Sequence, residues 1–264
     1  MLDFAGMTEN DLAALRRAVA LLEHPSFAAR LANMVGKPIE LIGYALPASA
    51  SQAITTATSK ALEMALAAAL RTMHHPPRAG SQLFHKALVT ASGAAGGAFG
   101  LATLPISTIT CCGRLRTLRE AQAKISPIPE AALSCVQVFA LGGRPDSADA
   151  SESGYFAVRS MLAKSVTQAA RFVVERGVIE EGGPVLVRFI TQVASRFGMV
   201  VTQKFAAQAI PVVGALGGAA VNYAFIEHFQ EVAQGHFTVR RLERAYGKEA
   251  VRKEYERFAQ HQRA

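Results

Sequence analysis

The chain has 264 residues, half of them hydrophobic, and carries a formal net charge of +8 at neutral pH. This length and composition allow a large hydrophobic core, which excludes an intrinsically disordered protein. The excess of Lys and Arg predicts an anionic partner, and the scarcity of aromatic residues, with no Trp at all, favours a lipid surface over nucleic acid.

Helix-forming residues dominate the chain, and the prolines fall at the boundaries between segments. We therefore expect an all-α fold, a single multi-helix bundle of about ten helices with two central apolar, Gly-rich segments. Residues 1–36 are assigned to N-terminal amphipathic helices, and residues 37–264 to the main helical domain.

The N-terminal residues include early acidic groups, and no basic region leads into an apolar core and a cleavage site, so we expect no signal peptide. Three cysteines are present, and Cys111 and Cys112 are adjacent. This arrangement gives neither a disulfide framework nor the ligand spacing of a metal site. The sequence therefore predicts a cytoplasmic protein, either free or on the inner face of the membrane, with no cofactor and no metal.

The first helix is predicted to start near Thr8, because Asp11 three residues later forms a weak capping signal. It should end at the His24-Pro25 step. Apolar residues at helical spacing form its inward face: Leu12, Leu15, Val19 and Leu22. Further long helices are predicted over residues 51–73, 129–141, 155–176, 184–207 and 210–246.

Residues 87–113 contain no charged side chain, and three arginines follow them directly. About 20 residues suffice to cross a bilayer as a helix, so this window is long enough. Small residues are as frequent in it as large ones, and Pro105 divides it, which favours two helices that meet near Pro105. The arginines are candidates for binding an anionic surface: Arg114, Arg116 and Arg119.

Glycines four residues apart recur in the two uncharged windows. Gly96 and Gly100 lie in the first, and Gly214 and Gly218 lie in the second, residues 205–226. Such pairs allow a second helix backbone to approach closely. We expect the two glycine faces either to pack on each other as core or to line a cavity for a ligand.

Asn222 is the one polar residue in the apolar first half of the last long helix. By helical angle it falls on the side of Phe225 and Phe229, so we expect it to be buried and hydrogen-bonded. It would then form an amide bond between helices or serve as a polar anchor inside a lipid or small-molecule cavity.

A polar cluster follows in the same helix, made of Glu227, His228, Glu231 and His236. On an unbroken helix the two histidines lie about 12 Å apart, too far to share one ion, although a bend at Gly235 would bring them closer. The favoured interpretation is a solvated polar end with His–Glu and Arg–Glu pairs. A metal or hydrolytic centre is the alternative.

The C-terminal region is strongly basic. From residue 236 onward eight Lys and Arg accompany four Glu. A solvated helical face explains this run, and binding to anionic headgroups is the functional alternative. The candidate residues for that role are Arg240, Arg241 and Arg244.

Three segments of the chain resemble the bacterial EcsC family: FGLATLPISTITCCGRLRTLRE, FALGGRPDSADASESGYFAVRSMLAK and AIPVVGALGGAAVNYAFIEHFQEVAQGHFTVRRLERAYG. The likeness extends over residues 37–255. The family takes its name from the third member of an operon that encodes a transporter of the ABC class. The resemblance implies a cytoplasmic, membrane-related accessory role, and it supplies no catalytic residues.

Three functions follow as hypotheses. The first is a non-enzymatic accessory protein that binds anionic lipid or a membrane protein of the ABC-transporter class, linked to a transporter or a lipid process. The second is a soluble module that binds a lipid or small molecule around Asn222. The third is a metal-dependent hydrolase at the polar cluster. No phosphate-binding loop, nucleophile elbow or HExxH motif is present, so no residue is assigned as catalytic.

Overall fold

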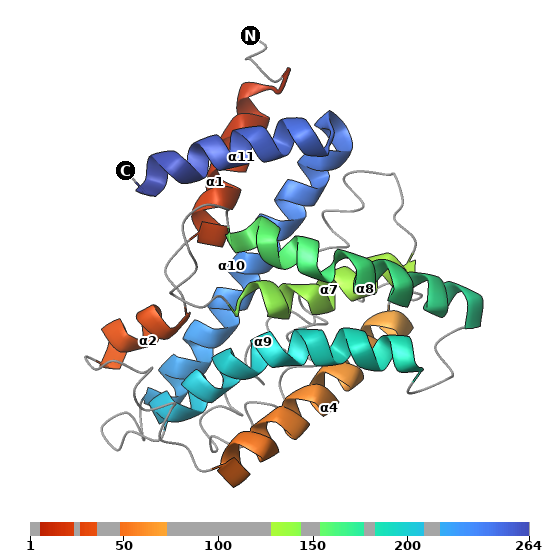
Figure 1. Cartoon of the computed structure of the whole chain (residues 1–264). Coiled ribbons are helices and arrows are strands. Elements are labelled where there is room, and N and C mark those ends of the chain that lie inside the picture. The colour runs from red at the N-terminus through yellow and green to blue at the C-terminus, as the bar shows by residue number, and fades with distance from the viewer. Residues whose placement is uncertain are drawn as a thin grey trace.

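The computed structural model describes residues 6–23, 27–35, 48–72, 128–143, 154–176, 183–208 and 217–263. These residues form eight α-helices and no strand, which confirms the all-α prediction (Figure 1). The helices are α1 (Glu9–Glu23), α2 (Phe27–Val35), α4 (Ala48–Thr72), α7 (Ile128–Leu141), α8 (Gly154–Arg176), α9 (Pro184–Gln208), α10 (Gly217–Tyr246) and α11 (Lys248–Arg263).

Several sequence predictions fall outside the described residues and stay predictions. They include the first apolar window, the total of about ten helices and the packing of the two glycine faces. Gly218 belongs to the first turn of α10, whereas the other named residues of these predictions are not described: Gly96, Gly100, Gly214, Arg114, Arg116 and Arg119.

Helix α1 begins and ends where the sequence predicts. The backbone N–H of Asp11 donates to the Thr8 hydroxyl oxygen at 3.2 Å, and that hydroxyl donates to the Asp11 carboxylate at 3.2 Å. This reciprocal cap satisfies an N–H that the helix itself leaves unpaired. The expected inward residues Leu15, Val19 and Leu22 are buried.

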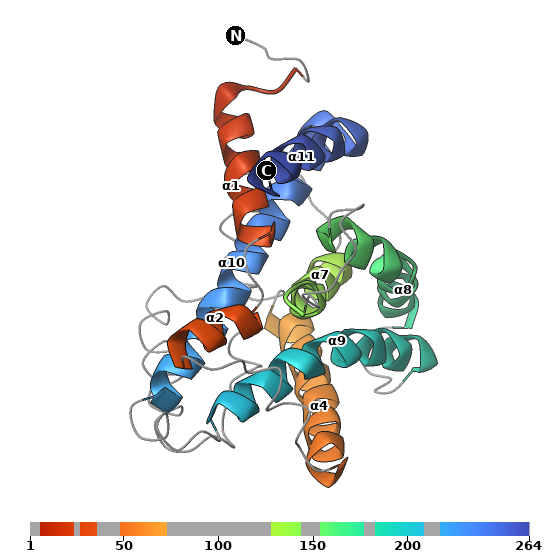
Figure 2. The same cartoon turned by 60° about the vertical axis from the view of Figure 1, so that its left-hand side comes forward.

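Helix α10 is the axis of the arrangement (Figures 1 and 2). Helix α1 packs along it more extensively than any other described helix, and α2, α7 and α9 contact it as well. At its C-terminal end Gly247 adopts a φ of +87°, and its N–H donates to the carbonyl of Glu243 at 3.0 Å. This left-handed residue ends the helix and turns α11 back across α1 and α10.

Helix α7 lies inside the arrangement and contacts α4, α8, α9 and α10. Residues 132–143 are buried without exception, and the buried set includes the polar Ser134 and Gln137. Its Phe139 packs on Phe197 of α9 and Phe229 of α10, with ring centroids 4.9 and 5.2 Å apart. These rings, with Phe225, form an aromatic centre where three helices meet.

Helix α9 contains the segment Pro184–Lys204, the one stretch within the described helices that is long and apolar enough to cross a membrane. Part of this segment is core, since Phe189 and Phe197 are buried and α9 packs against α4, α7, α8 and α10. Core helices pass the same test of length and composition, so this property alone does not place α9 in a bilayer.

Gly235 lies where α1 and α10 come into close contact, and α10 continues as one helix through this position. A Cβ atom here would lie 2.7 Å from Cγ of Leu22 and 3.1 Å from the backbone oxygen of Ala18. The glycine therefore allows close contact between the two helices, and it does not interrupt α10.

We predict that Gly235→Ala lowers the free energy of unfolding by on the order of 1 kcal/mol, because the added methyl group forces α1 away from α10. Gly198→Ala in α9 is the matched control, since nothing lies within 4 Å of its Cβ position. That control should raise stability by up to about 1 kcal/mol through helix propensity. Urea denaturation measures both, and equal effects of the two variants would contradict the close contact.

Candidate functional site

The four residues of the predicted polar cluster do not converge on one point. Glu227 is exposed and accepts a hydrogen bond from Tyr223. Glu231 binds a different helix, forming a 2.5 Å ion pair with Arg30 of α2. Among the described residues no group of three or more His, Cys, Asp or Glu side chains is placed to hold a metal ion. This geometry gives no support to the metal-dependent hydrolase.

The prediction of a solvated polar end is wrong for both histidines. His228 is 7% exposed and His236 only 1% exposed, so both belong to the core. A run of polar residues at the end of an apolar helix suggests a solvated end when only the local sequence is considered. Helices α2, α7 and α8 instead supply partners for these side chains, and that tertiary pairing is invisible in the local pattern.

His228 joins α10 to the end of α7. Its Nε2–H donates to the carbonyl of Gly142 at 3.0 Å, and its ring packs on Phe27 and Phe229. Burial is the main reason that its pKa falls to about 4, so the ring is neutral at physiological pH. A Cβ on Gly142 would lie 3.1 Å from Nε2 and 2.4 Å from a ring carbon of Phe229, so the site requires glycine.

His236 joins α10 to α8 and is enclosed by positive charge. Its Nδ1 lies 2.9 Å from the hydroxyl oxygen of Tyr155. Burial, followed by the cationic Arg159 and Arg240, holds its pKa well below the ordinary value. Its Nε2 is buried, and no described residue forms a hydrogen bond with it. Arg159 donates a hydrogen bond to the same tyrosine oxygen. We therefore assign the Tyr155 hydroxyl as the donor to Nδ1, so that Nδ1 accepts and the neutral imidazole carries its proton on Nε2.

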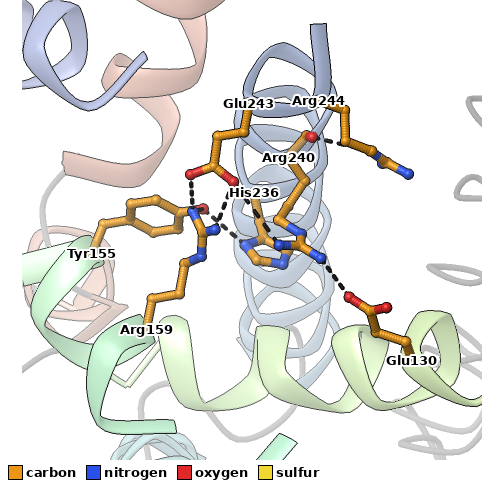
Figure 3. Close-up of polar contacts among 7 residues, drawn as sticks. All are labelled: Glu130, Tyr155, Arg159, His236, Arg240, Glu243 and Arg244. Carbon is orange, nitrogen blue, oxygen red and sulfur yellow. Dashed lines mark hydrogen bonds and ion pairs between the residues drawn. The ribbon is translucent and has the colours of Figure 1, made fainter. Parts of the chain in front are cut away.

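An ion pair joins Arg159 of α8 to Glu243 of α10 (Figure 3). The two guanidinium nitrogens donate to the two carboxylate oxygens at 2.7 and 2.6 Å, a bidentate geometry. The Glu243 side chain is only 5% exposed. Burial raises the pKa of Tyr155 to about 12, so its hydroxyl stays protonated beside this pair.

The predicted anion-binding arginines of α10 also make internal contacts. Arg240 donates to Glu130 of α7 at 2.8 Å, and Arg241 lies 2.8 Å from Asp11 of α1. Arg244 donates from Nε to the backbone carbonyl of Arg240. Their role at an anionic surface is untested, but two of the three cations already face a carboxylate within the chain.

Sequence reasoning missed the partners of α10 on other helices, chiefly Tyr155, Arg159 and Glu130. A weak signal existed, because Tyr155 and Arg159 are one turn apart and therefore share a face of α8. Nothing in that spacing identifies a partner 84 residues away. Asn222 lies in α10, but its side chain is outside what the structure describes, so its predicted role is untested.

We name these residues the α10 polar network and define it by Glu130, Tyr155, Arg159, His236, Arg240 and Glu243. Its contacts fasten α7, α8 and α10 to one another. A neutral imidazole bonded to a tyrosine hydroxyl could in principle transfer a proton, but both groups are buried and bonded inside the protein. The network is therefore best explained as a packing device.

The fold and this network define an all-helical protein whose central helix uses its polar residues to hold other helices. Residues 128–242, from the start of α7 into the last turns of α10, match the model of the EcsC protein family. The match confirms the resemblance for these residues, and this part of the chain belongs to that family, whereas the likeness over the rest of residues 37–255 stays a prediction. Searches of the curated proteins and of the solved structures gave no match.

We predict that the free energy of unfolding falls as pH decreases from 6.5 toward 4. Below pH 6.5 the unfolded chain protonates its histidines, whereas burial keeps His228 and His236 neutral in the folded protein. The unfolded state then binds more protons, so stability declines by on the order of 1 kcal/mol per pH unit for each histidine. Urea denaturation at several pH values measures this slope. His228→Gln should reduce it, and an unchanged slope would contradict the assignment.

We predict that Glu243→Gln destabilises the protein by about 3 to 5 kcal/mol, because it leaves the Arg159 cation in a buried site without its carboxylate. Arg252→Gln in α11 is the control, since its 2.7 Å pair with Glu256 is partly exposed and should contribute less than about 1 kcal/mol. Thermal unfolding followed by circular dichroism compares the two. Similar losses of stability in both variants would show that the buried Arg159–Glu243 pair contributes no more than the exposed pair.

Proposed function

We propose that this protein is a non-enzymatic accessory protein that associates with an anionic membrane surface and supports a transporter or a lipid process. The observation that carries the proposal is that the candidate reactive residues of α10 are engaged in internal contacts. His228 and His236 bind other helices, and Glu231 binds Arg30. The site therefore offers no free nucleophile, acid or base among these residues.

Membrane association is supported by charge and by family. The formal net charge of +8 attracts anionic surfaces, and the cytoplasmic leaflet of a membrane carries a negative potential. The EcsC resemblance implies a membrane-related accessory role. A cytoplasmic location follows as part of the same proposal.

The test is flotation with lipid vesicles. We expect the protein to float with vesicles made of equal parts phosphatidylcholine and phosphatidylglycerol, and not with vesicles of phosphatidylcholine alone. Raising the salt from about 0.05 M to about 0.5 M should release most of the bound protein, because the Debye length shortens to a few ångströms. Protein that stays in solution with both kinds of vesicle overturns the proposal.

Native mass spectrometry of protein purified without detergent separates this proposal from the soluble ligand-binding module. A module of that kind should retain a copurified lipid or metabolite, which appears as a mass increment. The accessory role predicts protein of the bare chain mass that still floats with anionic vesicles.

A further inference from the structure

Helices α8 and α9 together present a broad outward surface. The two consecutive helices pack against each other, and a guanidinium nitrogen of Arg196 lies 4.0 Å from the sulfur of Met161 across the seam between them. The two helices are neighbours in both views (Figures 1 and 2). We call this surface the α8–α9 face and define it by Met161, Lys164, Arg171, Arg188, Arg196 and Met199.

The charge of this face is positive. Helix α9 contains no acidic residue, and α8 contains one, Glu175. Within the described part of the chain, none of the four cations of the face forms an ion pair. Arg240 and Arg241 of α10 differ in this respect, since each has a carboxylate partner within 2.8 Å. The field of the α8–α9 face is therefore available to an external anion.

Flexible apolar groups lie among these cations. Met161 is 50% exposed and Met199 is 43% exposed, although each belongs to a helix whose other side is buried in the core. Val174 and Val187 are also exposed on the same two helices. Exposed methionines beside lysine and arginine side chains, whose aliphatic stems are themselves apolar, suit the boundary between headgroups and acyl chains.

We infer that the α8–α9 face is the surface through which the protein binds an anionic lipid bilayer. The inference rests on the membrane association proposed above and names the part of the molecule responsible. The four cations would contact phosphate groups, and the two methionines would enter the interfacial layer. A nucleic acid fits less well, because Phe189 and Phe197 of α9 are buried and so are not available for base stacking.

The first test compares two charge-neutralising double variants on the same vesicles of equal parts phosphatidylcholine and phosphatidylglycerol. Arg171→Gln with Arg188→Gln removes two exposed cations from the face. Lys248→Gln with Lys253→Gln removes two exposed cations from α11, which lies away from α9 in both views (Figures 1 and 2). Both variants lower the net charge equally, so any difference between them reports position.

The face variant should bind the vesicles about twenty-five-fold more weakly than the unchanged protein, since each surface cation contributes about five-fold. The α11 variant should lose less than about two-fold. Equal losses would mean that binding follows net charge alone, and this overturns the assignment of the face. A larger loss in the α11 variant overturns it as well. Circular dichroism checks that both variants are folded, as exposed substitutions should leave the helices intact.

A second test places a reporter on the face itself. The chain has no Trp, so Met199→Trp supplies its only indole. Adding the vesicles should shift the fluorescence of this variant to shorter wavelength, as the ring leaves water. Gln260→Trp on the exposed side of α11 is the control and should not shift. If Met199→Trp floats with the vesicles without a shift, the α8–α9 face is not the membrane contact.

The two tests separate failure of this inference from failure of the proposed function. If the unchanged protein does not float with anionic vesicles, the proposal of membrane association is wrong. The cations of the face would then bind an acidic protein partner. If it floats and the face variants behave like the α11 controls, membrane association stands and only its location changes.

Discussion

The bidentate ion pair between Arg159 and Glu243 sets how α8 lies against α10, and the neighbouring contacts depend on it. Arg159 also donates to Tyr155, whose hydroxyl meets His236. A nitrogen of Arg240 lies 3.9 Å from the Glu243 carboxylate, while its other terminal nitrogen binds Glu130 of α7. A bidentate pair fixes direction as well as distance, so the three helices share one relative placement. Hydrophobic contacts alone would tolerate more sliding, because they have no preferred direction.

A second constraint comes from backbone approach at the end of α7. Gly142 gives His228 its carbonyl acceptor, and the adjacent Gly143 lies so close to α9 that a Cβ would be 2.5 Å from the carbonyl oxygen of Arg196. One glycine thus spaces α7 from α10, and the next spaces α7 from α9. Two adjacent residues without side chains therefore set the distances among three helices of the core.

The sequence predicts the helices well because their signals are local. The Thr8 cap, the end of the helix predicted over residues 129–141 and the apolar spacing of α1 depend on neighbours within a few residues, and the structure agrees with these predictions. Family membership was also recognisable from contiguous segments of the chain.

The candidate site was predicted poorly, for a physical reason. Whether His236 faces water depends on Tyr155, which is 81 residues away in the chain, and helical angle gives no information about such a partner. A run of Glu, His and Arg residues has the same sequence pattern whether water solvates it or another helix supplies its hydrogen-bond partners. The composition of α9 does indicate a positively charged helix, because this long helix contains basic residues and no acidic residue.

The contact of α1 with α10 and α11 has a consequence for synthesis. Tyr246 of α10 donates to Asp11 at 2.6 Å across 235 positions of the chain, and Tyr255 of α11 donates to Glu23. On the ribosome the first helix therefore leaves the exit tunnel long before its partners exist, with Leu15 and Val19 exposed. Such sequence-distant contacts slow folding, and the apolar face of α1 needs protection from aggregation until the last helices emerge.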